Sequence, residues 1–180
     1  MRLIRQPGKG KGDAVRAGFA EAKGDILMIL DADLTVPAEM LPRFYEVIAS
    51  GYADFANGTR LVYRMDGRAM QFLNLLANHF FAWAFSYVLG QSVRDTLCGT
   101  KVMQKTLYDR IAANRSYFGD FDPFGDFDLL FGAALLHAKI TDVPVRYRER
   151  VYGETNISRF RHGLLLFRML GIAARKLKFR

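Results

Sequence analysis

The sequence predicts an α/β fold in which helices flank a mostly parallel sheet. Its 180 residues are 51% hydrophobic and 24% charged, which is typical of one globular domain with a sizeable core. Helical patterns alternate with short apolar runs in the first third of the chain, as in a layered α/β protein. Charged side chains follow these runs, and α/β sheets bind ligands at the carboxyl ends of their strands.

The first helix and strand are predicted from a cap and an apolar run. Asp13 can cap a helix that continues to about Lys23 and places Val15 and Phe19 on one face. Residues 26–30 form a continuous apolar run after Gly24-Asp25, which predicts a central strand buried on both faces.

The following elements repeat this alternation. Pro37 is suited to the first turn of a helix that extends to Ser50-Gly51, and a short strand is predicted over residues 53–57. Gly58, Thr59 and Arg60 follow that strand, so they are expected at the same edge of the sheet as the acids that follow residues 26–30.

The most apolar segment, residues 72–93, is interrupted by polar side chains. These interruptions disfavour a membrane-spanning helix, which needs about 20 predominantly apolar residues. We expect either a helix at a membrane interface or an ordinary core helix.

The net charge of +8 is confined to the C-terminal fifth of the chain. Residues 146–180 carry ten basic side chains against two acidic ones, interleaved with apolar residues, which predicts a helix that lies on an anionic membrane or holds a phosphate. No known nucleic-acid motif accompanies this charge, so no nucleic-acid partner is expected. The single cysteine, Cys98, and the absence of a signal peptide indicate a cytosolic chain.

Two segments near the start have the chemistry of a phosphate site. The glycine-rich basic loop 8–12, with Lys11 and Gly12, leads into a helix whose N–H groups favour phosphate, although a solvated turn is the alternative. Asp31 and Asp33 leave the predicted strand together and provide ligands for Mg²⁺ or Mn²⁺ beside diphosphate oxygens. Such a cation would neutralise a departing nucleoside diphosphate.

The segment Asp31-Ala32-Asp33-Leu34-Thr35 also fits the nucleophile motif of haloacid-dehalogenase-like phosphatases. That family carries the motif on its first strand, whereas here a basic loop and a helix precede it. A phosphatase that uses Asp31 therefore stays as an alternative.

Four acids among aromatic side chains precede a predicted helix over residues 129–137. Asp126 or Asp128, at the start of this helix, could act as a base, orient an acceptor or cap the helix. A cap needs only one acid, so we expect one of the two in a functional site.

In order and spacing, several segments resemble glycosyltransferase family 2, in its dolichol-phosphate mannose synthase-like branch. The segments that carry the resemblance are residues 10–19, Gly24-Asp25 with Asp31-Ala32-Asp33-Leu34, Pro37 and Glu39, Gly58-Thr59-Arg60, Asp95-Thr96-Leu97-Cys98-Gly99-Thr100-Lys101, Asp126-Phe127-Asp128, Val143-Pro144-Val145 and residues 150–155. The resemblance implies a GT-A fold, which is Rossmann-like, with amphipathic helices at the membrane interface.

The resemblance also implies a reaction and a set of site residues. The reaction is an inverting transfer of a sugar from a nucleotide sugar to a polyprenyl-phosphate or another lipid-linked acceptor, at the cytoplasmic face of a membrane. Asp31 and Asp33 fall near the metal and diphosphate, and Arg60 and Arg150 fall where the family binds phosphates. Thr155 is a further substrate-binding candidate, and Asp95, Asp126 and Asp128 are the catalytic candidates.

The resemblance divides the chain into a catalytic domain, residues 1–157, and a basic amphipathic helix, residues 158–180. Relatives begin with an apolar strand, a nucleotide-facing loop and an Asp-Asp-Gly-Ser segment that bind the base and ribose, and this sequence contains none of these. We therefore expect an N-terminally incomplete domain with weak or no nucleotide-sugar binding. An inactive membrane-docking fragment is the second alternative function.

Overall fold

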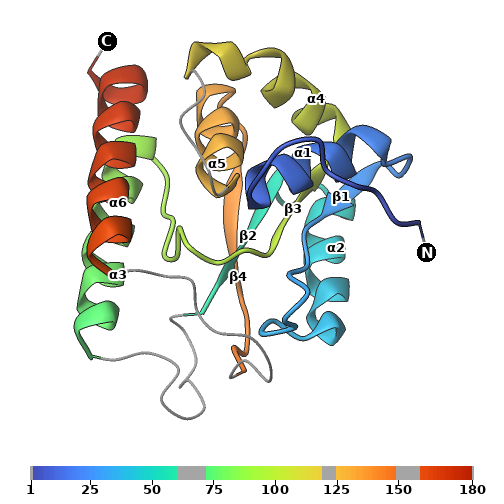
Figure 1. The fold of residues 1–180 in the computed structure, drawn as a ribbon, viewed down its shortest axis with the longest axis horizontal. Helices are drawn as coiled ribbons and strands as arrows, with labels where there is room; N and C mark the ends of the chain where they lie inside the picture. The colour runs from blue at the N-terminus through green and yellow to red at the C-terminus, as the bar shows by residue number, and fades with distance from the viewer. Residues whose placement is uncertain (1, 61–71, 119–124, 149–158, 180) are drawn as a thin grey trace.

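The computed structural model describes residues 2–60, 72–118, 125–148 and 159–179. Helices and strands alternate through these ranges, with a four-stranded sheet at the centre (Figure 1). No helix among the described residues is long and apolar enough to cross a membrane.

The sheet has the strand order β1-β3-β2-β4, with β1 at Ile26–Met28, β2 at Phe55–Thr59, β3 at Lys101–Gln104 and β4 at Ile140–Pro144. β3 lies between β1 and β2 and is antiparallel to both, whereas β2 and β4 are parallel. Thus β1, β2 and β4 run in one direction, but only one of the three pairings is parallel. The expected mostly parallel sheet is right for strand direction and wrong for pairing, because β3 is inserted in the opposite sense.

Helices cover both faces of the sheet. On one face, α2 (Leu41–Ala49) packs through Phe44 and Ile48 against Ala56 of β2 and Val102 of β3. The larger core lies on the other face of the sheet. There α1 (Lys11–Glu21), α4 (Lys105–Ala113) and α5 (Asp126–Leu135) pack against the strand side chains that point away from α2. Because neighbouring strand residues point to opposite faces, Val102 and Met103 belong to different cores.

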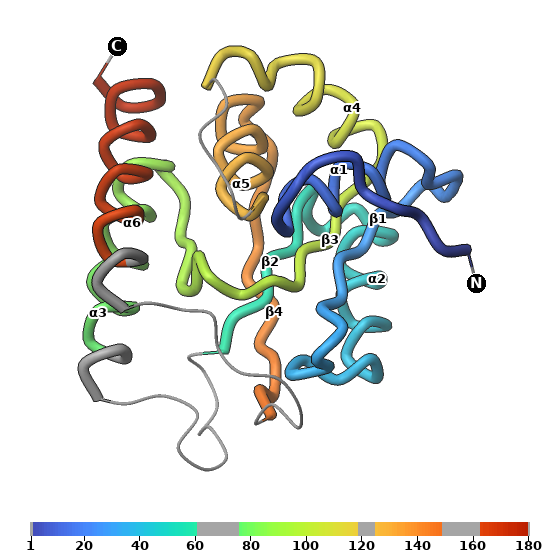
Figure 2. Tube along the Cα trace, viewed as in Figure 1, coloured from blue at the N-terminus to red at the C-terminus, as the bar shows by residue number. Residues whose placement is uncertain are grey.

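Two further helices lie side by side along one edge of the molecule (Figure 2). α3 (Phe72–Leu89) packs on α6 (Arg159–Ala173), and a π-helical turn over Ala174–Lys178 extends α6. Met169 and Ala173 of α6 are fully buried in the larger core. The predicted C-terminal helix therefore shares a core with the rest of the chain.

The exposed side of these two helices is aromatic. Leu76, Phe80, Trp83 and Tyr87 follow one another at spacings of four, three and four residues on α3, and all are exposed. Leu164 and Phe167 of α6 are exposed too, and the Phe167 ring lies 6.1 Å from that of Phe80. We call these six residues the aromatic stripe. The opposite side of α3 is buried, so this helix belongs to the core, as one of the two expectations had it, and its exposed side is apolar.

Several predicted boundaries shift by a few residues. α1 begins at Lys11, after Gly10, so Asp13 lies inside its first turn and accepts a 2.6 Å hydrogen bond from the Gly8 N–H instead of capping the helix. α5 begins at Asp126, three residues before the predicted start. In both cases a glycine with positive φ, Gly10 or Gly125, precedes the helix where an acid was expected to cap it.

Candidate active site

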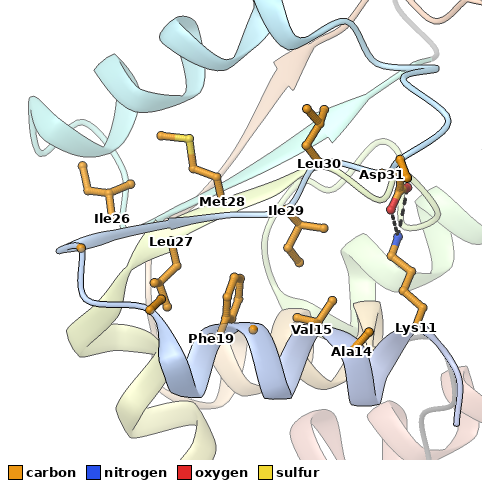
Figure 3. A pocket seen from close by; sticks show the side chains of 14 residues that line it. Lys11, Ala14, Val15, Phe19, Ile26, Leu27, Met28, Ile29, Leu30 and Asp31 are labelled. Atoms are coloured by element: carbon orange, nitrogen blue, oxygen red, sulfur yellow. Dashed lines mark hydrogen bonds and ion pairs between the residues drawn. The ribbon is translucent and has the colours of Figure 1, made fainter. Parts of the chain in front are cut away.

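The candidate site lies beyond the carboxyl end of β1, where the N-termini of α1 and α5 meet. Lys11 is the first residue of α1, and Asp126 is the first residue of α5. Asp31 lies three residues beyond the end of β1. Figure 3 shows the Lys11 side chain reaching from α1 to the Asp31 carboxylate. The fold thus brings together three residues that are widely separated in the sequence.

Lys11 links two of the predicted acids. Its Nζ lies 2.9 Å from Oδ1 and 3.1 Å from Oδ2 of Asp31, and 3.8 Å from Oδ2 of Asp126. Burial alone would lower the pKa of Lys11, but the charges of Asp126 and Asp31 outweigh it and raise the pKa above its ordinary value. Lys11 is therefore a fixed positive charge at the mouth of the site.

Glycines allow the elements of the site to approach this closely. A Cβ on Gly99 would collide with the Asp31 carboxylate and with Lys11 Nζ. Gly125, with φ +73°, lies against the Gly12 backbone, so the first turns of α1 and α5 touch glycine on glycine. Gly99 therefore forms part of the wall of the site.

Asp33 is held by its own loop. Its Oδ1 accepts hydrogen bonds from the N–H and the hydroxyl of Thr35, at 3.2 and 3.0 Å. Asp31 faces Lys11, whereas at least one oxygen of Asp33 is directed to Thr35.

The structure separates the roles of Asp126 and Asp128. Asp126 lies between Lys11, at the mouth of the site, and the buried Lys101 behind it. Asp128 accepts a 2.7 Å hydrogen bond from Nε of Arg115, which places it in a different charge pair, with a residue that follows α4. No side-chain cap is formed at the start of α5, so neither acid has the capping role that we considered.

Asp95 and Arg60 form a buried pair. Nε and Nη2 of Arg60 lie 2.6 and 2.9 Å from the two oxygens of Asp95, which also accepts the N–H groups of Arg60 and Leu97. Burial would raise the pKa of Asp95, but Arg60 outweighs it and holds this pKa below its usual range. The geometry is that of a carboxylate that anchors an arginine rather than one that accepts a proton.

Of the remaining phosphate-binding candidates, the structure describes Arg60 only. Arg60 has two of its guanidinium nitrogens engaged by Asp95, and its guanidinium stacks over Tyr147 at 5.3 Å. Arg150 and Thr155 lie outside the described residues.

A cavity of about 450 Å³ runs along α1 and β1 and ends at the Lys11–Asp31 pair (Figure 3). The apolar side chains that line it include Val15 and Phe19 from α1 and Leu27 and Ile29 from the strand and the residues that follow it. The apolar run 26–30 is therefore not fully buried on both faces as predicted, since β1 lies at the end of the described strand order.

The acids of the site are compatible with a cation that is shared with a ligand. Among the described residues, no three His, Cys, Asp or Glu side chains form a group that could hold a metal by themselves. Mg²⁺ commonly takes one or two carboxylates and completes its shell with phosphate oxygens and water. Asp31 fits that requirement because its carboxylate is 38% exposed and already attracts a cationic group.

The sequence analysis assigned no role to Lys101, which lies directly behind the site. Its side chain is fully buried and its Nζ is 3.3 Å from Oδ1 of Asp126. The available signal was a lysine directly before the apolar pair Val102-Met103, in a position where a strand residue would be buried.

Cys98 is a buried free thiol. Its burial raises the pKa to about 11, so the thiol stays protonated and unreactive at neutral pH.

The site lies beyond a strand end, which is where open α/β sheets commonly bind their ligands. The model of the family described as "Glycosyl transferase family 2" matches residues 1–116. The chain belongs to glycosyl transferase family 2, as the resemblance implied.

Within this family, the chain is similar to several enzymes that are named for polyprenyl-phosphate acceptors. The chain is 32% identical over 162 residues to a dolichyl-phosphate hexose transferase of Haloferax volcanii, covering 90% of this chain and 67% of the relative. It is 30% identical to an undecaprenyl-phosphate 4-deoxy-4-formamido-L-arabinose transferase of Pseudomonas fluorescens, over 94% of this chain and 46% of that protein. It is 27% identical to a dolichol-phosphate mannosyltransferase of Pyrococcus furiosus, over 87% of this chain and 43% of that protein. The chain thus spans between 43% and 67% of these relatives.

A solved structure supports the fold. Glucosyl-3-phosphoglycerate synthase of Mycobacterium tuberculosis matches 98% of this chain and 57% of its own, with a TM-score of 0.57 and 20% identity. This likeness confirms the predicted GT-A type of α/β fold and says nothing further about the reaction.

Proposed function

We propose that this chain carries the phosphate- and metal-binding part of a glycosyltransferase that moves a sugar from a nucleotide sugar to a polyprenyl phosphate or another lipid-linked acceptor. The observation that carries the proposal is the meeting of Lys11, Asp31 and Asp126 at two helix N-termini. Helix N-termini and lysines attract phosphate, and the three relatives are named as transferases of polyprenyl phosphates.

In this proposal each residue has a distinct task. Lys11 and the N-terminal N–H groups of α1 hold the diphosphate of the donor. Asp31 would hold Mg²⁺ or Mn²⁺ against the same diphosphate, and Asp33 would stabilise the loop that presents it. The metal would supply neutralisation of the departing diphosphate. Asp126 positions Lys11 and the acceptor, since a phosphate acceptor is already anionic and needs little help from a base.

The acceptor proposal includes contact with a membrane. The aromatic stripe exposes large side chains next to basic ones, including Arg168 of α6 and Lys178, whose Nζ lies 4.8 Å from the Tyr87 ring. Aromatic side chains prefer the membrane–water interface, and Lys and Arg are attracted to anionic lipids. We propose that α3 and α6 together hold the chain on the surface from which the acceptor is taken.

A transfer assay tests this function. The chain is incubated with polyprenyl phosphate in vesicles, a panel of nucleotide sugars, and Mg²⁺, Mn²⁺ or a chelator. In line with the weak nucleotide-sugar binding expected from the sequence, we expect weak transfer that requires the cation. Transfer should fall about 100-fold in Asp31→Asn, which removes the charge that holds the cation. Asp109→Asn, at an exposed acid of α4, is the control and should keep full activity.

The alternatives give different results in the same experiment. Hydrolysis of a phosphomonoester that Asp31→Asn abolishes would support the phosphatase. Vesicle binding without transfer, unchanged in an Asp31→Asn/Asp33→Asn variant, would support the inactive docking fragment.

A further inference from the structure

Lys101 is a lysine in the interior of the protein, on the first position of β3. Its side chain has no exposed surface, and it donates a 2.5 Å hydrogen bond to the Cys98 carbonyl. A buried ammonium is costly unless an opposite charge accompanies it. Here that charge is Asp126, whose Oδ1 is buried and receives no hydrogen bond from the described residues, so the ion pair with Lys101 is what compensates its burial.

Four charges follow one another from the interior to the surface, in the order Lys101, Asp126, Lys11, Asp31. Their side-chain exposures rise in that order, from 0% through 9% and 31% to 38%. Two are positive and two negative, so the row is neutral. The two oxygens of Asp126 are divided, with Oδ1 toward Lys101 at 3.3 Å and Oδ2 toward Lys11 at 3.8 Å.

Lys11 therefore stands between two carboxylates, and the distances show which one holds it. It is in contact with Asp31 at 2.9 Å and lies farther from Asp126. Asp126 is the more buried acid, and an unpaired carboxylate there would attract Lys11 more strongly than the half-exposed Asp31 does, because charges interact more strongly away from water. Because Lys101 already neutralises the Asp126 carboxylate, Asp126 does not compete with Asp31 for Lys11.

We propose that Lys101 is a positioning residue that keeps Lys11 on Asp31, at the open end of the row. The proposal rests on the proposed function, in which Lys11 binds the donor diphosphate from that place. Without Lys101, Lys11 is drawn inward to Asp126 and away from the ligand.

The chain offers a matched control in the same turn of α5. Arg115 pairs with Asp128 as Lys101 pairs with Asp126, and both carboxylates are buried. Arg115 is half-buried, its ion pair is with Asp128, and its guanidinium lies over the Tyr108 ring. Lys101→Met and Arg115→Met therefore each remove one cation from a buried acid, and only the first acts on the row.

The first test is structural and needs no substrate. Crystal structures of the two variants are expected to show Lys11 Nζ moved from Asp31 to Asp126 in Lys101→Met and unmoved in Arg115→Met. Adding Asp126→Asn to Lys101→Met removes the attraction and should return Lys11 to Asp31. If Lys11 stays on Asp31 in Lys101→Met, the proposal is wrong. Where Lys101→Met does not fold, Lys101→Gln carries the same test and keeps the donor to Cys98.

The second test is kinetic and separates positioning from a loss of stability. We expect Lys101→Met to raise KM for the nucleotide sugar about tenfold or more, the effect of one lost charge-assisted hydrogen bond, while kcat changes little. Arg115→Met should leave KM unchanged. An equal KM in the two variants would contradict the inference while leaving the proposed function intact. Absence of transfer by the unaltered chain would instead refute the proposed function, and the position of Lys11 would still decide the inference.

Discussion

Three buried carboxylates of this protein differ in their partners, and the partners decide their roles. Asp126 lies between the buried Lys101 and Lys11 at the mouth of the site, Asp128 is paired with Arg115, and Asp95 is paired with Arg60. All three were catalytic candidates because the resemblance named them together. The sequence could not separate them, because the deciding lysine and arginines lie 13 to 115 positions away along the chain.

The buried pair of Asp95 and Arg60 is expected to contribute strongly to stability. Asp95→Asn leaves the Arg60 guanidinium without its charge partner, and breaking a buried pair by removal of one member costs about 3–5 kcal/mol. Urea denaturation measures the loss. Asp109→Asn breaks an exposed pair with Lys105 and should cost about 0.5 kcal/mol or less. Similar losses in the two variants would show that the Asp95 pair is not a stabilising contact.

The same pair predicts how stability depends on pH. The pKa of Asp95 is lower in the folded protein, so its contribution is present above the ordinary aspartate pKa and is lost as the pH falls through the folded value. The free energy of unfolding should therefore decrease as the pH falls below about 5 and continue to decrease below the ordinary aspartate pKa, and the decrease should be smaller in Asp95→Asn. An identical slope in both proteins would assign the acid sensitivity to other groups.

At the scale of the elements, sequence patterns predicted the helices and strands that have a clear apolar period. α2, with Phe44 and Ile48 buried, and β2 were predicted close to their observed positions. β3 was missed because it is only four residues long, begins with a lysine and runs directly into α4. Since β3 separates β1 from β2, this one short strand also explains the wrong pairing.

The contact between α1 and α5 gives a prediction about helix packing. Gly125, with φ +73°, would as alanine place its Cβ against the Gly12 backbone. Gly51 has a similar φ of +72°, but its Cβ would have no atom within 4 Å, so Gly51→Ala is the control. Both should lose about 1 kcal/mol from the strained φ. Gly125→Ala should lose about 1–3 kcal/mol more, because the two helices must separate. Equal losses in thermal or urea unfolding would mean that the helices accommodate the methyl group.

At the scale of the whole molecule, the candidate site residues and two apolar helices were predicted, but the aromatic stripe that the two helices form together was not. The basic C-terminal segment was expected to form a helix on a membrane, and the structure packs it on α3 so that Phe167 and Phe80 join one exposed surface. A helical period identifies one face of each helix. It does not say which two helices will share that face, because their contact joins residues far apart in the sequence.

The aromatic stripe leads to a prediction for the whole chain. Trp83 is 68% exposed on the stripe, and Tyr45, 51% exposed, lies on α2, which covers the sheet face opposite the larger core. We expect Trp83→Ser to weaken binding to vesicles of anionic lipid about tenfold, because one large aromatic side chain is lost from the interface. Tyr45→Ser should leave binding unchanged.

Cosedimentation with vesicles measures both variants, and neutral vesicles separate the two forces involved. The basic side chains that accompany the stripe act only on anionic lipid, so the unaltered chain should bind neutral vesicles more weakly, and added salt should weaken its binding to anionic ones. Trp83→Ser should lose affinity for both kinds of vesicle, since its contribution does not depend on charge. If Tyr45→Ser lost as much affinity as Trp83→Ser, the membrane-facing surface would have to be placed elsewhere than on α3 and α6.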